Sequence, residues 1–314
     1  MDSHGGRLIV VTGKGGVGKT TISAAIGLTA AEAGLRTLIV ETASDSRLLS
    51  LFGLREGASG SEREISPGLQ SIRLTPRQLV EDYFTSLLRF SFLSRRLFES
   101  SSFNALTAAA PGISEFLLLE RVLEWLAPGQ RRRQFDVVIL DGPATGHAIK
   151  LLRAPKNIHT MVPAGPLAGS TSRMMELLSN PRHAEVVIVG IPEELSVQET
   201  IETYRTLGEE VGVPIARPVV NRMFPQRFQR AEIEQIEAAD ASLPAIAAAR
   251  FAIARRHQAE RNCARLKRAL GVTPLQLPQV FSARIEIEQL RQFGLRLNEE
   301  LHLSAPSRRR SRTG

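Results

Sequence analysis

The sequence predicts an α/β protein with a mostly parallel, doubly wound sheet and a helical elaboration. Strand-like and helical segments alternate along the chain, and most strand-like segments are apolar at every residue instead of every second one. Strands of this kind belong to parallel sheets that helices cover on both faces. No internal repeat or long linker divides the 314 residues. We expect one domain over 1–303, with helical elaboration at about 76–130 and a basic, disordered tail at 304–314.

The N-terminal part begins with a strand, a helix and a second strand. Continuous β-branched and apolar runs predict strands at 7–13 and 36–42. An Ala-rich helix is expected between them at 20–33, ended by Gly34, because glycine favours the left-handed conformation of a helix C-cap. The polar, glycine-rich stretch 53–68 is interpreted as a surface loop.

The rest of the chain continues the alternation and ends in helices. The expected elements are a helical stretch at 79–126, strands at 135–143, 184–192 and 214–221, a helix at 196–212, a helical stretch at 230–270, a short strand at 272–277 and a helix at 285–301.

Composition narrows the function classes. The net charge of +8 comes mainly from scattered arginines. The sequence lacks the RNA-binding signatures in which aromatic residues are interleaved with basic ones, so we expect no sequence-specific nucleic-acid partner. The chain has no apolar run of membrane-span length and begins without a secretory signal, which indicates the cytoplasm. Cys263 is the only cysteine, which excludes an intramolecular disulfide and a cysteine-built metal site within one chain.

The stretch "GKGGVGKT" at 13–20 fits the phosphate-loop pattern G-x-x-x-x-G-K-[ST], with a strand before it and a helix after it. Glycines let consecutive N–H groups surround an anion at a helix N-terminus. Lys19 is expected to reach the outer phosphates, and the Thr20 hydroxyl to ligate Mg²⁺. The predicted nucleotide-binding residues are Gly13, Gly15, Gly16, Val17, Gly18, Lys19, Thr20 and Thr21.

Lys14 occupies a position where the pattern accepts any residue. Its charge is not needed to surround phosphates within one subunit. Two interpretations follow from the residues alone: a solvated lysine at the edge of the loop, or a catalytic cation that reaches a nucleotide held by a facing subunit.

"GKGGVGKTT" resembles the deviant phosphate loop of the family that includes the MinD and ParA ATPases, the nitrogenase iron protein and the arsenite-pump ATPase. "FDVVILDGPATGHAIKLLRAP" resembles the switch segment D-T-A-P-T-G-H-T-x-R-L-L of ArsA-type ATPases. "PGISEFLLLERV", "VVIVGIPEELSVQET" and "PVVNR" agree with the same branch, which includes arsenite-pump ATPases and ATPases that deliver tail-anchored membrane proteins. The resemblance covers most of 7–301.

The resemblance implies a P-loop NTPase fold, the cofactors ATP and Mg²⁺, and a nucleotide-bridged homodimer in which Lys14 acts across the interface. It also nominates Asn221 to bind the adenine, although a polar residue that merely ends a strand is the alternative. Asp141 ends a buried strand beside the loop, where a carboxylate can hold a water on Mg²⁺; a helix N-cap is the alternative.

Two departures from the branch affect the expected activity and client. Ala43 stands where the family has the aspartate that positions the attacking water, so Asp45 is the first candidate for that role and Glu41 the second. The cysteines of arsenite-pump members and the CxxC zinc site of targeting members are both missing. We therefore do not expect arsenite as a ligand.

The sequence favours a Mg²⁺-dependent ATPase whose homodimer acts on a protein client, such as a hydrophobic helix. The helices of 79–126 are candidates for a client groove, whereas Met161, Met174, Met175, Leu177 and Leu178 are expected to pack mainly in the core. The alternatives are a nucleotide-binding switch that hydrolyses little or no ATP, and a ParA-like partitioning ATPase. ATP is preferred over GTP on family resemblance, since no N-K-x-D guanine motif is present.

Overall fold

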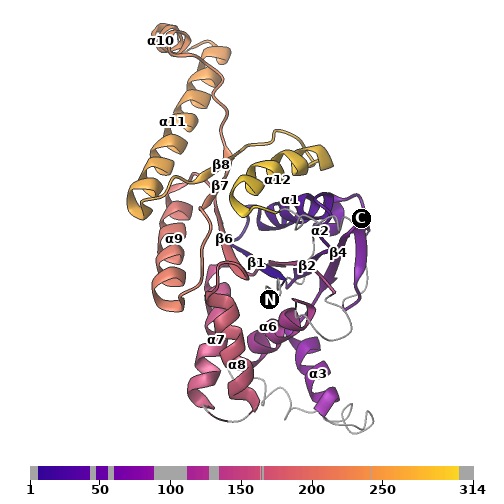
Figure 1. Cartoon of the computed structure of the whole chain (residues 1–314). Helices are drawn as coiled ribbons and strands as arrows, with labels where there is room; N and C mark the ends of the chain where they lie inside the picture. The colour runs from indigo at the N-terminus through magenta and orange to yellow at the C-terminus, as the bar shows by residue number, and fades with distance from the viewer. Residues whose placement is uncertain are drawn as a thin grey trace, which may run out of the picture.

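A mostly parallel sheet forms the centre of the molecule (Figure 1). The computed structural model describes residues 6–42, 47–55, 60–87, 112–126, 134–162, 164, 166–240 and 242–303. Within these residues the strands are β1 (Arg7–Thr12), β2 (Thr37–Glu41), β3 (Arg63–Ser66), β4 (Leu69–Arg73), β5 (Val137–Asp141), β6 (Ala184–Gly190), β7 (Val219–Met223) and β8 (Leu275–Pro278). Their spatial order is β3-β4-β2-β5-β1-β6-β7-β8, and among them β3 alone runs antiparallel to its neighbour. The predicted fold class is confirmed.

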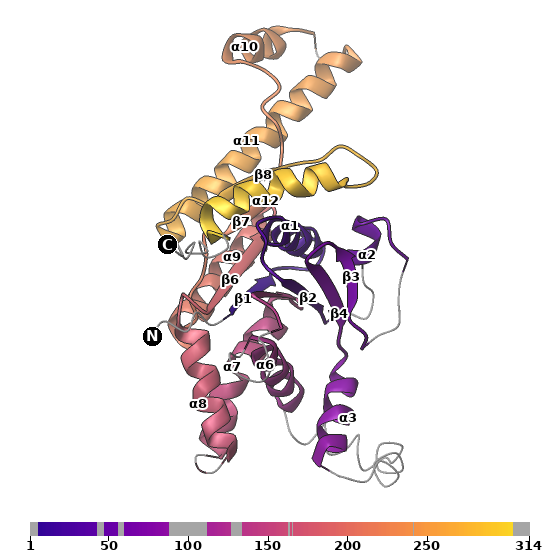
Figure 2. The same ribbon diagram turned by 45° about the vertical axis from the view of Figure 1, so that its right-hand side comes forward.

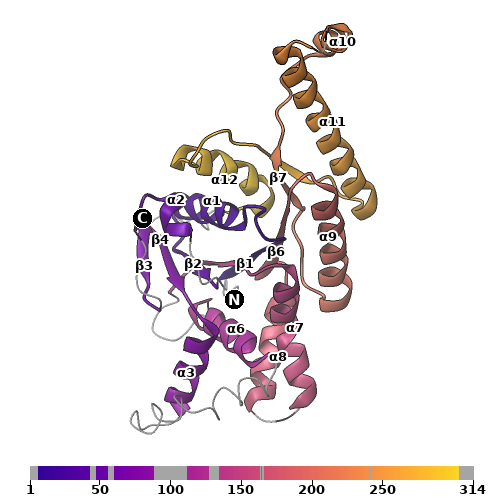
Figure 3. The same ribbon diagram turned by 180° about the vertical axis from the view of Figure 1, so that it is seen from behind.

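Helices cover both faces of the sheet. They are α1 (Lys19–Glu32), α2 (Leu48–Leu51), α3 (Pro76–Leu87), α6 (Ile113–Leu126), α7 (Thr145–Met161), α8 (Pro166–Ser179), α9 (Glu194–Arg205) with its π-helical extension η1 (Thr206–Val211), α10 (Arg230–Ala238), α11 (Pro244–Leu270) and α12 (Ile287–Leu301). Figures 1 and 3 show α1 and α12 on one face and α6, α7 and α8 on the other. No helix in this part of the chain is both long and apolar enough to cross a membrane.

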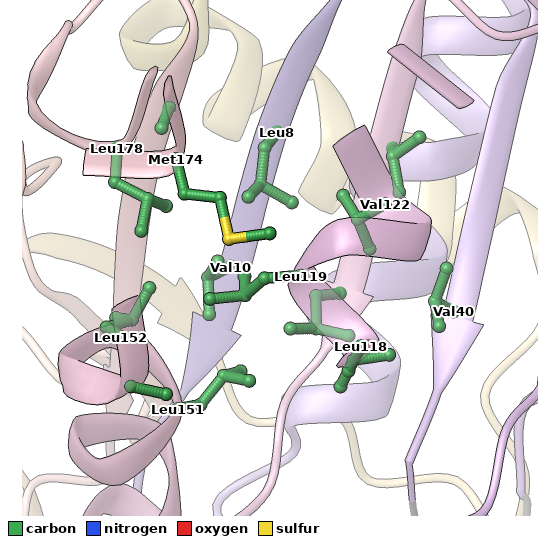
Figure 4. Close-up of a cluster of buried hydrophobic side chains, with 14 of the residues drawn as sticks. Leu8, Val10, Val40, Leu118, Leu119, Val122, Leu151, Leu152, Met174 and Leu178 are labelled. Atoms are coloured by element: carbon green, nitrogen blue, oxygen red, sulfur yellow. The ribbon is translucent and has the colours of Figure 1, made fainter. Parts of the chain in front are cut away.

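The alternation of side chains along β1 explains why both faces are covered. Leu8 and Val10 point into the core under α6, α7 and α8, where Met174 packs beside them (Figure 4). Ile9 and Val11 point into the opposite core, against α1 and α12. A strand that is apolar at every position therefore contributes to two cores at once.

Two differences from the sequence prediction have local causes. The predicted loop 53–68 contains β3, which forms an antiparallel hairpin with β4 through Gly68 at φ +77°. The side chains of this edge strand are half-buried or exposed, so it has no apolar run to reveal it. The predicted helix 230–270 is two helices, because the chain is extended at Ala239 and the next helix begins at Pro244.

Two domain predictions fall partly outside the described residues. Of the helical elaboration, α3 and α6 are described, and 88–111 and 127–130 are not. The predicted tail, 304–314, also lies outside. The division of the chain into a single domain over 1–303 therefore stays a prediction.

Helices α10 and the first part of α11 project from the body as an arm (Figure 2). No residue of α10 is buried, and the buried residues of α11 begin only at Ile253. Further along, Cys263 and Leu266 pack against Met223 of β7 and Val197 of α9. The second half of α11 is thus anchored to the body, and the first half extends beyond it.

Helices α1 and α12 cross closely at Gly294. A Cβ atom at this position would lie 1.8 Å from Thr29 Oγ1 and 2.7 Å from the carbonyl oxygen of Ala25. We predict that Gly294→Ala lowers the free energy of unfolding by about 1–3 kcal/mol, because the helices would have to separate. Urea denaturation measures this change. Gly169→Ala, in α8 with no atom within 4 Å of the new Cβ, is the matched control and should be neutral or stabilising. Equal effects of the two substitutions would contradict this account of the crossing.

Candidate functional site

The phosphate loop connects β1 to α1 at the carboxyl edge of the sheet. Gly13 has φ +148°, and a Cβ there would lie 2.0 Å from the carbonyl oxygen of Val189. Gly18 has φ +99°, and its Cβ would lie 2.5 Å from Asn221 Nδ2. Side chains at these two positions would be both strained and obstructed, so the loop needs glycine for its conformation and its packing. The loop lies where β5 and β6 flank β1, at the edge where doubly wound sheets bind ligands.

Lys19, the first residue of α1, folds back over the loop. Its ammonium donates to the carbonyl oxygens of Gly13 at 3.1 Å and Lys14 at 3.3 Å. Burial lowers the pKa of Lys19, and the carboxylates of Asp141 and Glu199 oppose that shift. A partly desolvated cation beside a glycine turn is suited to a phosphate anion.

Asp141 lies buried beneath the loop, at the end of β5. Its Oδ2 accepts a hydrogen bond from the Thr20 hydroxyl at 2.7 Å, and its Oδ1 accepts one from the Ser23 hydroxyl at 2.9 Å. Burial raises the pKa of Asp141; the two hydroxyls and Lys19 oppose this shift. The parallel register aligns Asp141 with Val11 of β1, one residue before the end of that strand. The start of α1 and the end of β5 are thereby brought together.

The segment after Asp141 is tied to the loop and to α9. The Thr12 hydroxyl donates to the carbonyl oxygen of Pro143 at 3.1 Å. The Thr145 hydroxyl, at the start of α7, donates to Glu199 Oε1 at 2.5 Å. The segment with the family's switch pattern thus has contacts to two elements around the loop.

Lys14 lies at the exposed edge of the loop. Its ammonium is 3.9 Å from Glu199 Oε2, and about half of its side chain is exposed. An ion pair this long and this exposed contributes little to the free energy of folding. Gly15 and Gly16 are exposed beside it, with open space where a Cβ would stand.

Of the two candidates for the carboxylate that positions the attacking water, the structure describes only Glu41. Glu41 is buried at the end of β2 and aligned with Asp141 in the adjacent strand. Asp45 and Ala43 belong to 43–46, which lie outside the described residues. The roles of Glu41 and Asp45 stay predictions.

Asn221 lies against the phosphate loop, where its amide is bonded at both ends. Nδ2 donates to the carbonyl oxygen of Val17 at 2.9 Å, and Oδ1 accepts from the backbone N–H of Arg222 at 2.9 Å. These bonds hold the loop against β7. The role of Asn221 at the adenine stays a prediction.

A cleft of about 900 Å³ opens beside the loop and the first turn of α1. Its volume suits a nucleotide. Thr21 lines it, and so do three arginines from separate elements: Arg47 before α2, Arg222 at the end of β7 and Arg284 before α12. Among the described residues that line the cleft there is positive charge and no carboxylate, which favours a polyphosphate ligand.

The sequence analysis did not identify Ser23, Glu199 or these arginines as site residues. Ser23 could have been found, because it lies one helical turn after Thr20 and so shares a face of α1 with it. Glu199 and the arginines come from elements distant in sequence, which no local pattern brings together.

We predict that Asp141→Asn raises the Tm of the nucleotide-free protein at neutral pH by a few degrees. The raised pKa means that the folded protein holds this proton more tightly than the unfolded chain. Ionisation of Asp141 therefore lowers stability as the pH rises through the raised pKa, and this loss is absent below the unfolded pKa of about 3.9. The difference in Tm should shrink as the pH falls.

Thermal unfolding followed across the pH range checks this expectation. Asp136→Asn is the control: Asp136 accepts hydrogen bonds from the Arg36 guanidinium, so its loss should lower the Tm. A Tm of Asp141→Asn at or below that of the wild type at every pH would show that the buried charge is fully compensated.

Comparison with known proteins places the sequence in a family. Residues 6–164, half of the chain, match the family model described as anion-transporting ATPase. ATPase BagA of Mycobacterium tuberculosis is 26% identical over 231 residues, which cover 72% of this chain and 67% of that protein. The arsenical pump-driving ATPases of Acidiphilium multivorum and Escherichia coli are 28% and 27% identical, over 68% of this chain but only 39% of their own lengths. The loop, switch segment and family match lead to one conclusion: the chain belongs to the anion-transporting ATPase family and is an ATPase by that membership.

Proposed function

We propose that the protein is a Mg²⁺-dependent ATPase whose homodimer changes state with the nucleotide and acts on a protein client in the cytoplasm. The observation that carries the proposal is the 2.7 Å contact between the Thr20 hydroxyl and the Asp141 carboxylate at the foot of the phosphate loop. Oxygen atoms of these types are ligands that Mg²⁺ accepts, directly or through water. Thr20 would hold the ion directly and Asp141 through a water.

The chain's own residues supply the remaining parts of phosphoryl transfer. Mg²⁺, when bound, neutralises charge on the β- and γ-phosphates. Lys19 adds a cation at the outer phosphates, and the loop's N–H groups orient them. Asp45 is the first candidate to orient the attacking water, and Glu41 the second.

The cross-subunit role of Lys14 is supported by its position. Among the described residues, the ion pair of its ammonium is the long, half-exposed contact with Glu199, which holds it only weakly within its own subunit. The exposed Gly15 and Gly16 would let a facing loop approach closely. A second subunit placed there would receive Lys14 near its own nucleotide.

A route from the nucleotide to a client is supported by the packing around the switch segment. A small apolar crevice of about 140 Å³ lies between Pro143 and the helices α3, α6 and α7, with Leu79, Leu118 and Leu151 in its lining. A displacement of Pro143 would directly change the packing of these helices. Half of the candidate groove region at 79–126, residues 88–111, lies outside the described residues.

The client is not proposed to be arsenite, although relatives are arsenical pump-driving ATPases. Cys263 is the only thiol in the chain, and burial raises its pKa to about 11. One protonated thiol supplies no multidentate soft-ligand site. Met174 and Leu178 are buried in the core, as expected. The same expectation is wrong for Met161, whose side chain is 72% exposed at the end of α7.

Ala43 specifically favours a second candidate function, a nucleotide-binding switch with little hydrolysis. In this alternative the nucleotide still controls dimerisation, but no carboxylate orients the water that would attack the γ-phosphate. The rate of ATP turnover by the purified protein separates the two. A ParA-like partitioning role remains a third candidate.

The nucleotide site predicts different losses for two substitutions. Lys19→Ala should abolish measurable ATP binding in calorimetry, because the outer phosphates lose their cation. Thr20→Ala should retain nucleotide binding without metal and lose most of the affinity gained on adding Mg²⁺. Ser50→Ala, at a residue that lines the cleft outside the phosphate loop, is the control for Thr20. Wild-type ATP affinity in Lys19→Ala would remove the assignment of the loop.

Mixing two inactive variants tests the cross-subunit role of Lys14. Lys14→Ala and Asp141→Asn should each have little ATPase activity alone. If Lys14 acts across the interface, a mixed dimer has one complete site, made of Asp141 from the first variant and Lys14 from the second. Random mixing should then restore about a quarter of the wild-type rate.

No restoration, in mixtures shown by native mass spectrometry to contain mixed dimers, would mean that Lys14 acts within its own subunit. Mixing Lys14→Ala with Lys14→Gln is the negative control, since neither variant carries the lysine.

A further inference from the structure

A cluster of two phenylalanines and two arginines is formed by the loops that follow β7 and β8 and by α11. We call it the Phe–Arg patch: Phe224, Arg227, Arg255 and Phe281. The rings of Phe224 and Phe281 meet edge to face, with centroids 6.2 Å apart. The Arg227 guanidinium lies 5.1 Å from the centre of the Phe281 ring, and that of Arg255 lies 5.0 Å from the centre of the Phe224 ring.

The patch lies at the surface and is not part of a hydrophobic core of the described residues. Phe281 is 62% exposed, and neither phenylalanine belongs to the hydrophobic clusters of the described residues. The exposed Phe281 ring therefore keeps apolar surface available for a ligand. Cation–π contacts of this kind fix the orientation of both partners.

The charge around the patch is positive. Arg222, near the end of β7, and Arg284, in the loop that follows β8, line the nucleotide cleft. Within the described part of the chain, Arg222, Arg227 and Arg284 form no ion pair, and Arg255 has a contact of 3.9 Å with Glu193. The whole chain carries a net charge of +8. The ligand that complements this surface is an anion.

We propose that the Phe–Arg patch binds single-stranded nucleic acid without sequence preference. Proteins of that kind combine aromatic rings, on which bases stack, with cations that follow the phosphate backbone. The patch presents both within one small area. An acidic protein segment would use the arginines but leave Phe281 without a flat partner. This binding goes beyond the proposed ATPase cycle and does not depend on it.

The patch does not appear in the sequence as interleaved basic and aromatic residues, because its four residues come from segments that are distant along the chain. Phe224 and Arg227 follow β7, Phe281 follows β8, and Arg255 comes from α11. The parallel pairing of β7 with β8 brings the two loops together. Stacking is indifferent to base identity, so the proposal agrees with the expectation of no sequence-specific nucleic-acid partner.

Fluorescence anisotropy of a labelled oligo-dT strand of about 20 nucleotides, titrated with the full chain at low salt, tests the proposal. We expect binding that weakens steeply with added salt. Phe281→Ala should weaken it about tenfold through loss of stacking. Arg227→Gln should weaken it and reduce the slope of log K against log salt by about 0.7, the value for one phosphate contact on a single strand.

Two exposed residues of the arm give matched controls. Phe251→Ala removes another exposed phenylalanine, and Arg230→Gln removes an arginine whose side chain is 95% exposed. Both should leave binding unchanged. ATP binding should be normal in all four variants, which shows that a loss of oligo-dT binding is not a loss of fold.

Three outcomes would overturn the proposal. One is no binding of oligo-dT at low salt. Another is oligo-dT binding that is unchanged in Phe281→Ala but abolished when Arg308, Arg309 and Arg310 are replaced by Gln. That result would assign the binding to the basic tail. The third is equal binding of a poly-glutamate peptide with the same loss in Phe281→Ala, which makes the patch a site for acidic protein segments.

Discussion

A buried carboxylate beneath the phosphate loop is the constraint on which the rest of the site depends. Asp141 is held by the hydroxyls of Thr20 and Ser23, both on the first turns of α1, and Lys19 adds a nearby positive charge. A buried charge is costly unless polar partners surround it. The start of α1 must therefore remain close to the end of β5. The same pairing presents an oxygen ligand pair at the place where the loop can hold phosphates.

The sheet and the packing of the loop satisfy this constraint. The parallel register brings the ends of β1, β2 and β5 to one edge, and continuous apolar sequence keeps each strand buried on both faces. Gly13 and Gly18 allow the loop to contact Val189 and Asn221 without a clash. The loop is thus shaped from outside by neighbouring strands, and its own sequence only permits that shape.

This explains which features the sequence could predict. The strands with uninterrupted apolar runs and the phosphate loop were predictable, because their signals are local. The hairpin of β3 and β4 was missed because its edge strand is polar. Glu199, Arg284 and the Phe–Arg patch could not be predicted, since their neighbours are distant in sequence. Asp45 belongs to the segment 43–46, outside the described residues, so its role in orienting the attacking water stays a prediction.

The contacts around the switch segment suit it to a transition between two states. Thr12 holds Pro143, and Glu199 holds Thr145 while lying near Lys14. Each such hydrogen bond contributes on the order of 1 kcal/mol, more where a carboxylate accepts it, so together they oppose displacement by a few kcal/mol. Couplings between ligand sites typically lie in the range of about 1–3 kcal/mol. The restraint is therefore strong enough to define one position of the segment, and weak enough for a nucleotide and the proposed second subunit to change it.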